Sequence, residues 1–305
     1  MLKKAYLEIT NVCNLSCSFC PGTRREKRFM TPNEFETLSR KLRGQVEYLY
    51  LHLMGEPLLH PQLEEILGIA ARQGFRVIIT TNGTLLDRRG DLLVSSPAVY
   101  KVNISLQSFE GNGAAEPDGY VGMCADFAAR MSAAGKQCVL RLWNKNGLDS
   151  LNPQIETALE ARFPKPWRDS RGSRYIAERV LLQPGERFDW PDMSAEDTGA
   201  QRFCRGLRDQ IGVLCDGTVV PCCLDHEGDI ALGNLFEDEL SDIMSTERAR
   251  RIYDGFSQRR AAEELCRRRG MMPDEAAIEA EADQMLEMMQ MMGAPAPSRE
   301  EMLEA

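Results

Sequence analysis

Long apolar runs are the clearest absence from this sequence of 305 residues. No run approaches the roughly 18 consecutive apolar residues that a membrane-spanning helix needs. The segment that begins at Met1 leads straight into charged residues and lacks the apolar core of a secretory signal. We therefore expect no membrane contact and a cytoplasmic location, where thiols stay reduced and the ten cysteines would serve metal binding or catalysis.

An excess of positive charge is missing as well. The formal net charge is -9, but residues 271–305 alone hold nine acidic side chains and one basic one, so residues 1–270 are nearly neutral. Proteins that bind nucleic acid need a basic surface for the phosphates, so nucleic acid is not an expected partner. The exception is the segment 162–174 with its five basic residues. We interpret it as a solvated linker, and a patch for an acidic peptide or a phosphorylated substrate is the alternative.

Histidine is scarce, and cysteine replaces it as the candidate metal ligand. The chain has three histidines, which we interpret as packing or turn residues: His52, His60 and His226. Three cysteines, in contrast, fall within eight residues: Cys13, Cys17 and Cys20. Only about one random sequence in a hundred with this composition would contain that spacing, so chance is a poor explanation.

The residues before these cysteines predict where the thiols lie. Ala5, Leu7 and Ile9 alternate with polar residues, which is typical of a strand, so the cysteines would occupy the loop at its C-terminal end. In parallel β/α barrels that end carries the chemistry. Structural zinc and ordinary iron-sulfur clusters take four protein ligands, so a tight group of three leaves one metal position for an outside molecule. A zinc loop completed by a distant cysteine is the alternative.

The first 190 residues alternate strands with helices. Thr31-Pro32-Asn33-Glu34 combines a capping residue, a proline and an acid, which together start a helix. Further strands are expected near residues 46–53, 75–80, 99–106, 137–143 and 178–183, and further helices from residue 61 and over 85–94, 118–134 and 150–161. This alternation predicts parallel βαβ units with right-handed crossovers. The glycine-rich loop 111–117 is expected to be a flexible connection, with a lid as the alternative.

The spacing Cys13-x-x-x-Cys17-x-x-Cys20, with Phe19 before the last cysteine, resembles the signature of the radical S-adenosylmethionine (radical SAM) enzymes. The resemblance implies an α/β fold in which residues 1–190 form a partial (β/α)6 barrel. It implies that the three thiolates hold three irons of a [4Fe-4S] cluster, that S-adenosyl-L-methionine chelates the fourth iron, and that Phe19 belongs to the cofactor-binding set. An external one-electron reductant such as flavodoxin or ferredoxin would serve as partner.

Two strand ends carry further motifs that support this resemblance. Met54-Gly55-Glu56-Pro57 resembles the Gly-Gly-Glu-Pro element of the family, with methionine in place of the first glycine. Its backbone and acid hold the substrate's ammonium in that family, which places Gly55, Glu56 and Pro57 among the cofactor-binding residues. Asn82, in Thr81-Asn82-Gly83, is a further candidate, and ordinary turn chemistry is its alternative.

The fourth and fifth strands add three polar candidates. The resemblance suggests that Ser105 contacts the ribose or carboxylate of the cofactor and that Gln107 faces the substrate, whereas the alternative is polar filling of the barrel. Arg141 stands between two leucines, and a buried guanidinium needs an anionic partner. The cofactor carboxylate would be that partner by resemblance, and a structural ion pair is the other possibility.

A second group of cysteines marks residues 200–270 as a small cysteine-rich extension. It resembles the twitch extension, the one-cluster relative of the SPASM domain, which implies an auxiliary iron-sulfur cluster held by Cys204, Cys222 and Cys266. The sequence departs from that pattern because Arg269 stands where the fourth thiolate is expected. We expect an incomplete site. The alternatives are a fourth ligand from Cys223, from Arg269 or from the substrate, weak binding, loss of the cluster, or zinc.

Local patterns complete the C-terminal part. Asp216-Gly217 predicts a two-residue hairpin turn that would pair Cys215 with Thr218 and place Cys222 roughly 13 Å further along, opposite Ile211. Cys215 is therefore not expected to share a site with Cys222. A helix is predicted over residues 240–253. Residues 271–305 hold eight of the fifteen methionines and are expected to form an acidic helical tail that packs on the protein or on a partner.

The resemblance implies a radical SAM enzyme that cleaves S-adenosylmethionine reductively to a 5′-deoxyadenosyl radical, which then abstracts hydrogen from a substrate. The substrate would be a peptide or protein being modified, or a small molecule being oxidised. A non-enzymatic metal-binding or electron-transfer module and an RNA-modifying radical SAM enzyme are the alternatives. The sequence does not predict the substrate itself, because specificity depends on loops that differ among proteins of one fold.

Overall fold

One sheet of eleven strands organises the protein, which a computed structural model describes over residues 2–113, 117–170, 172–187, 189–201 and 204–268. The strand order is β11-β10-β9-β1-β2-β3-β4-β5-β8-β7-β6. The strands are β1 (Leu2–Leu7), β2 (Val46–Tyr50), β3 (Arg76–Thr81), β4 (Val99–Ser105), β5 (Gln137–Lys145), β6 (Arg168–Ser170), β7 (Ser173–Ala177), β8 (Val180–Glu186), β9 (Gln210–Val213), β10 (Thr218–Val220) and β11 (Gly233–Asn234). The helices are α1 (Pro32–Leu42), α2 (Leu63–Arg72), α3 (Leu86–Ser95), α4 (Ser108–Gly111), α5 (Asp118–Ala133), α6 (Asn152–Arg162), α7 (Leu240–Ser245), α8 (Glu247–Ser257) and α9 (Glu264–Arg267), with a 3₁₀ turn η1 (Pro57–Leu59). Within these ranges no helix has the length and apolarity needed to cross a membrane.

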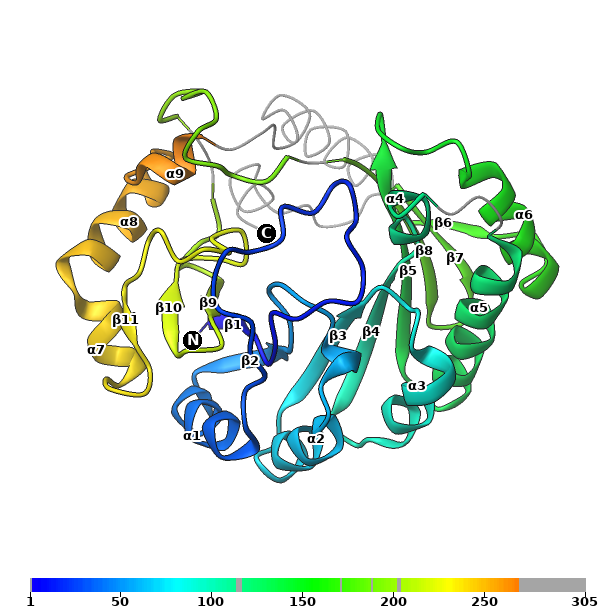
Figure 1. The fold of residues 1–305 in the computed structure, drawn as a ribbon, viewed down its shortest axis with the longest axis horizontal. Helices are drawn as coiled ribbons and strands as arrows, with labels where there is room; N and C mark the ends of the chain where they lie inside the picture. The colour runs from blue at the N-terminus through cyan, green and yellow to red at the C-terminus, as the bar shows by residue number, and fades with distance from the viewer. Residues whose placement is uncertain (1, 114–116, 171, 188, 202–203, 269–305) are drawn as a thin grey trace, which may run out of the picture.

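Six strands, β1 to β5 and β8, pair in parallel, and α1, α2, α3, α5 and α6 connect them. Figure 1 shows these helices outside the curved sheet, with the loop that follows β1 lying across the middle of the molecule. This arrangement confirms the predicted α/β fold with a partial (β/α)6 barrel. We call the sheet face turned toward the helices the convex face and the opposite one the concave face.

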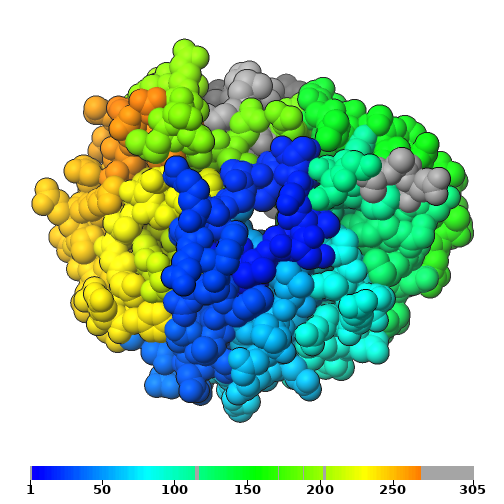
Figure 2. All heavy atoms as spheres, viewed as in Figure 1, coloured from blue at the N-terminus to red at the C-terminus, as the bar shows by residue number. Residues whose placement is uncertain are grey.

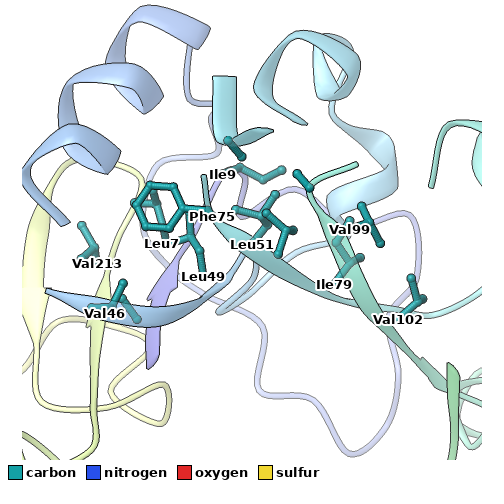
Figure 3. Close-up of a cluster of buried hydrophobic side chains, with 14 of the residues drawn as sticks. Leu7, Ile9, Val46, Leu49, Leu51, Phe75, Ile79, Val99, Val102 and Val213 are labelled. Carbon is teal, nitrogen blue, oxygen red and sulfur yellow. The ribbon is translucent and has the colours of Figure 1, made fainter. Parts of the chain in front are cut away.

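The main hydrophobic core fills the space between the convex face and the helices. Leu7, Leu49, Ile79 and Val102 are fully buried there and come from four neighbouring strands (Figure 3). Because strand side chains alternate, the residues between them face the concave side. A shift of one residue in the pairing of a strand would turn its apolar side chains to the concave face. Each apolar side chain removed from the core would cost about 2 kcal/mol of stability, so the register is strongly specified.

The basic segment 162–174 is not the solvated linker that we expected. Residues 168–170 and 173–177 form the antiparallel hairpin β6–β7, which pairs with β8 and extends the sheet beyond the barrel. Arg174 makes a bidentate ion pair with Glu156 of α6, at 2.6 and 2.9 Å. The linker interpretation failed because part of this segment joins the sheet and Arg174 has a structural partner, neither of which composition alone reveals.

Two C-terminal elements also differ from expectation. The predicted helix 240–253 is split into α7 and α8 at Thr246, whose hydroxyl caps α8 by accepting the amide of Ala249 at 3.3 Å. The hairpin β9–β10 is shifted by one residue, because Leu214 bonds Thr218 across a three-residue turn rather than a two-residue one. Gly217, at φ +86°, takes the left-handed position that such a turn requires.

The C-terminal extension joins the barrel through a pairing that the sequence did not predict. Strand β9 lies parallel to β1, with Tyr6 beside Gly212 and Leu7 beside Val213. The two cysteine regions, about 190 residues apart in the chain, therefore flank the same strand. The proposed boundary between residues 190 and 200 stays a prediction, and the Met-rich tail 271–305 lies outside the described residues.

A buried ion pair holds this junction together. The guanidinium of Arg25, in the cysteine loop, donates to both carboxylate oxygens of Glu8 at 2.8 and 2.7 Å. Glu8 is fully buried and also accepts the amides of Met54 at 3.0 Å and of Cys215 at 3.2 Å. The remaining Arg25 nitrogen, Nε, donates to the carbonyl of His226 at 2.8 Å. A single pair therefore connects β1, the cysteine loop, the turn after β2 and the C-terminal extension.

Removal of the cation should destabilise the protein strongly. We expect Arg25→Met to lower the free energy of unfolding by about 3 kcal/mol, because it leaves the buried Glu8 carboxylate without its partner. Thermal or urea unfolding measures the change. Arg24→Met is the matched control, since the neighbouring Arg24 side chain is 87% exposed and should change the midpoint little. Equal midpoints for the two variants would contradict the structural role of the pair.

Candidate functional site

The loop that carries Cys13, Cys17 and Cys20 is tied at both ends. Asn11 donates to the carbonyl of Glu26 at 2.8 Å and accepts the amide of Arg28 at 2.9 Å. These bonds close the loop at the C-terminal end of β1, where the alternation of residues predicted it. Figure 2 shows a narrow opening ringed by this N-terminal segment, drawn in blue.

The three thiols lie within electrostatic reach of one another. Although Cys13 is exposed by area, desolvation by the surrounding loop raises the pKa of its thiol, and the thiol of Cys20 raises it further. Desolvation likewise raises the pKa of Cys17, with smaller contributions from Cys20 and Cys13. Three thiolates this close would repel one another unless a cation joined them, so metal binding and thiol deprotonation are coupled here.

Asn112 supports the loop, and sequence reasoning did not find it. Its side-chain nitrogen lies 3.1 Å from the sulfur of Cys17, and its oxygen accepts the amide of Ser16 at 3.0 Å. Gly111 packs so closely that an added Cβ would lie 2.6 Å from the ring of Phe19. The first part of the glycine-rich loop thus docks on the cysteine loop, while residues 114–116 lie outside the described residues. The available signal was a Gly-Asn pair soon after a strand on the same edge.

Gly55 brings the turn after β2 against the main chain of the cysteine loop. An added Cβ would lie 2.6 Å from the carbonyl oxygen of Thr10 and 2.8 Å from that of Val12, and the backbone has φ +75°. The next residue, Glu56, donates its amide to Val12 at 2.8 Å. Only glycine fits this approach, because both the space and the left-handed backbone exclude a side chain.

The carboxylate of Glu56 is turned into the protein. One oxygen accepts the amide of Leu58 at 2.9 Å and the hydroxyl of Thr81 at 2.8 Å, and the other accepts the amide of Asn82 at 2.7 Å. Burial raises the pKa of Glu56 to about 7 despite these donors. The carboxylate therefore joins the start of η1, at Pro57, to the end of β3. Both oxygens of Glu56 thus have partners within the protein, and its expected contact with an ammonium stays a prediction.

Asn82 lies beside the first cysteine. Its side-chain nitrogen donates to the side chain of Asn14 at 2.9 Å and stands 4.0 Å from the sulfur of Cys13. Its own carbonyl accepts the hydroxyl of Tyr120 at 2.6 Å. The Asn-Gly turn is therefore more than a connection, because it holds an amide at the thiol.

The candidates on β4 and β5 meet on the concave face. Ser105 and Arg141 are partners in the register of the two strands. Gln107 follows β4 at the start of α4. Among the described residues, the side-chain oxygen of Gln107 and the Nε of Arg141 are buried without a hydrogen-bond partner. Unpaired buried polar atoms are costly, so both atoms are suited to a ligand that supplies the missing partners.

The arrangement fits a cluster better than a single ion. Within the described ranges, no three histidine, cysteine or acidic side chains stand close enough to hold one metal ion. A zinc site needs such a set, because all its ligands share one atom. Thiolates that bind three different irons stand farther apart, as they do on this loop, and the nearby amides of Asn82 and Asn112 suit sulfur acceptors.

The second group of cysteines meets in one small pocket. Cys204, Cys222 and Cys266 line a cavity of about 20 Å³ beneath α8 and α9. Cys215 is elsewhere, with its thiol donating to the carbonyl of Glu8 at 3.0 Å, and Cys223 packs in the cluster around Tyr6. The donor set fits three thiolate ligands, although the pocket now has room for about one water and would have to widen for a cluster.

One carboxylate that the sequence did not suggest also lines this pocket. Asp225 accepts the amides of Gly228 and Asp229 on one oxygen, and that of Ile230 on the other. Its first role is therefore to hold the turn 225–230. Arg269 lies outside the described residues, so the fourth position of the pocket stays a prediction.

Comparison with known proteins agrees with both halves of this arrangement. Residues 7–116 match the family model of the radical SAM superfamily, and residues 204–268 match that of an iron-sulfur cluster-binding domain, SPASM. A GTP 3',8-cyclase from Chlorobaculum tepidum is 37% identical over 108 residues, which cover 34% of this chain and 32% of that protein. The shared region thus spans about a third of that relative.

Solved structures resemble nearly the whole chain. BtrN in complex with AdoMet and 2-DOIA has a TM-score of 0.58 at 18% identity and covers 89% of this chain and 94% of its own. SuiB from Streptococcus suis, bound to precursor peptide SuiA, has a TM-score of 0.60 at 17% identity and covers 88% of this chain and 70% of its own. At these identities the likeness shows a shared fold.

The contact at Gly55 can be tested against a matched glycine. We expect Gly55→Ala to lower both stability and bound iron, because the new methyl would meet the cysteine loop. Gly44→Ala is the control, since Gly44 has the same φ of +75° but open space around it. The control should cost about 1 kcal/mol from backbone strain alone and leave the iron content unchanged. Iron analysis after anaerobic reconstitution and thermal unfolding measure the two effects, and equal losses in both variants would refute the packing argument.

Proposed function

We propose that this chain, whose residues 7–116 match the radical SAM superfamily, is an enzyme whose reactive cluster is held by Cys13, Cys17 and Cys20. The observation that carries the proposal is the group of three thiols within electrostatic reach of one another at the C-terminal end of β1. When bound, a [4Fe-4S] cluster and S-adenosylmethionine together supply a 5′-deoxyadenosyl radical that takes a hydrogen atom from the substrate.

The chain's own residues bind and orient these groups. We propose that Asn82 and Asn112 donate to the thiolates of Cys13 and Cys17, which stabilises their negative charge. Main-chain carbonyls around Gly55 would accept the ammonium of S-adenosylmethionine. Its carboxylate would take the side chains of Ser105 and Arg141, which adjoin on the concave face.

The second pocket would hold an auxiliary cluster through Cys204, Cys222 and Cys266. The match of residues 204–268 to an iron-sulfur cluster-binding domain and the three cysteines that line the pocket support this assignment. Such a cluster would serve as an acceptor for the electron that remains on the substrate after hydrogen abstraction. A flavodoxin or ferredoxin would deliver the first electron from outside.

For the substrate we propose two classes, a small molecule that is oxidised or a peptide that is modified. Both have counterparts among proteins of this fold, since BtrN is solved with AdoMet and 2-DOIA and SuiB with a precursor peptide. The enzymatic proposal differs from an electron-transfer module in one product, because only the enzyme releases 5′-deoxyadenosine.

That product provides the test of function. We expect the anaerobically reconstituted and reduced protein to release 5′-deoxyadenosine from S-adenosylmethionine, and Cys17→Ala to release none because a ligand is lost. Cys138→Ala is the control, since Cys138 is a buried core thiol far from both sites. Chromatography of the quenched reaction measures the nucleoside. A wild-type protein that binds iron but yields no nucleoside would rule out the enzyme.

Iron counting tests the auxiliary site separately. We expect about eight irons per wild-type chain, and about four in Cys266→Ala and in Cys17→Ala, because each substitution removes one cluster. The Cys138→Ala control should keep the wild-type count. About four irons in the wild type, unchanged by Cys266→Ala, would mean that the pocket of Cys204 holds no cluster.

A further inference from the structure

Three cations face the interior of the barrel without an acidic partner. Lys4 lies on β1, Lys101 on β4 and Arg141 on β5, all partly buried. Among the described residues, none of the three side chains makes an ion pair or a hydrogen bond, and the Nε of Arg141 is fully buried. Burial lowers the pKa of each, that of Arg141 to about 10, and the charge of Arg141 lowers the pKa of both lysines further. The three charges therefore share one space.

The neighbouring carboxylates are already engaged. Glu8, on the same face of β1, is held by Arg25 through two bonds. Asp209 influences Lys4 but pairs with Arg205 at 3.2 Å. Like charges gathered at low dielectric repel one another, so the group is stable only when solvent or an anion offsets it.

Aromatic rings border the cations. The ammonium of Lys4 lies 5.5 Å from the ring of Tyr6 and 5.6 Å from that of Tyr50. The guanidinium of Arg141 stacks 4.1 Å above the ring of Trp143. These contacts orient the positive groups but leave their hydrogen-bond donors for another molecule.

A ligand-sized cavity adjoins this group on the concave face. It measures about 430 Å³, and its lining includes Gln137, Tyr175 and Arg168. Gln137 is the register partner of Lys101, so the cavity begins next to that lysine. Arg168, on the hairpin β6–β7, stacks 4.7 Å from the ring of Tyr175 and makes no ion pair within the described residues. The volume suits a small molecule.

We propose that the substrate is a small molecule with an anionic group, a phosphate or a carboxylate, which Lys4 and Lys101 bind on the concave face beside Arg141. The inference rests on the proposed function and narrows its substrate class. Each lysine offers a point charge with three hydrogen-bond donors, which suits the oxygens of either anion. The ring-bearing or aliphatic remainder of the substrate would then occupy the cavity toward Tyr175.

Calorimetric titration of the anaerobically reconstituted protein tests the site with two probes, inorganic pyrophosphate and citrate. We expect at least one of them to bind, with an affinity that falls as salt is raised. Lys4→Gln and Lys101→Gln should each weaken binding about tenfold, since each removes one charge-assisted contact. Lys3→Gln is the matched control, because Lys3 is exposed and points to the other face of β1, and it should bind as the wild type does.

Tighter binding of pyrophosphate would identify a phosphate, and tighter binding of citrate a carboxylate. The inference is overturned if neither probe binds, or if Lys3→Gln weakens binding as much as Lys101→Gln. Release of 5′-deoxyadenosine by the wild type is measured without substrate, so that a failure of anion binding is distinguishable from a failure of the proposed function. Anion binding without nucleoside release in the wild type would refute the enzyme and leave the anion site intact.

Discussion

The ion pair between Glu8 and Arg25 is the contact on which the arrangement of both cysteine regions depends. A charge removed from water is tolerated only when its hydrogen-bonding capacity is used, and Glu8 accepts four bonds from three separate segments. Those segments are the cysteine loop, the turn at Met54 and the hairpin at Cys215. None of these segments is a strand or a helix at the point of contact. The bonds to Glu8 therefore hold them in place where regular backbone hydrogen bonds would otherwise do so.

A loop positioned in this way can present three thiols and stay open. Bonds of Asn11 close the cysteine loop at its base, and neighbours that reach it from β2, β3 and β4 support the part that carries the thiols: Gly55, Asn82 and Asn112. These neighbours contact backbone or donate a single amide, so they support the thiols without adding a fourth ligand. The geometry of the barrel end would keep open the metal position that the spacing predicts, because the carboxylate of Glu56 already has partners.

The sequence predicted the features that depend on local pattern. Alternation and caps gave the six parallel strands and their helices, and the spacing of the cysteines indicated an open metal site. It could not predict contacts between residues far apart, such as the bond between Cys215 and Glu8 across 207 positions. Nor could it assign the basic segment to the hairpin β6–β7, because Arg174 differs from a solvated arginine only through its partner Glu156. The one-residue error at β9–β10 arose because a glycine in the left-handed position, such as Gly217, occurs in hairpin turns of three residues as well as in turns of two.

In the proposed function, radical generation and substrate selection make different demands on the thiol end and on the concave face of this barrel. The thiol end is held largely by main-chain contacts at Gly55 and by the side-chain amides of Asn82 and Asn112. Such contacts suit a cofactor whose shape does not vary. The concave face presents long cations over aromatic rings, and such groups discriminate by charge and reach. A radical abstracts whichever hydrogen lies nearest, so selectivity must come from anchoring the substrate at a distance from the reacting carbon. Lys4 and Lys101 lie on the sheet away from the thiols, where an anionic anchor would fix the molecule without touching the reactive centre.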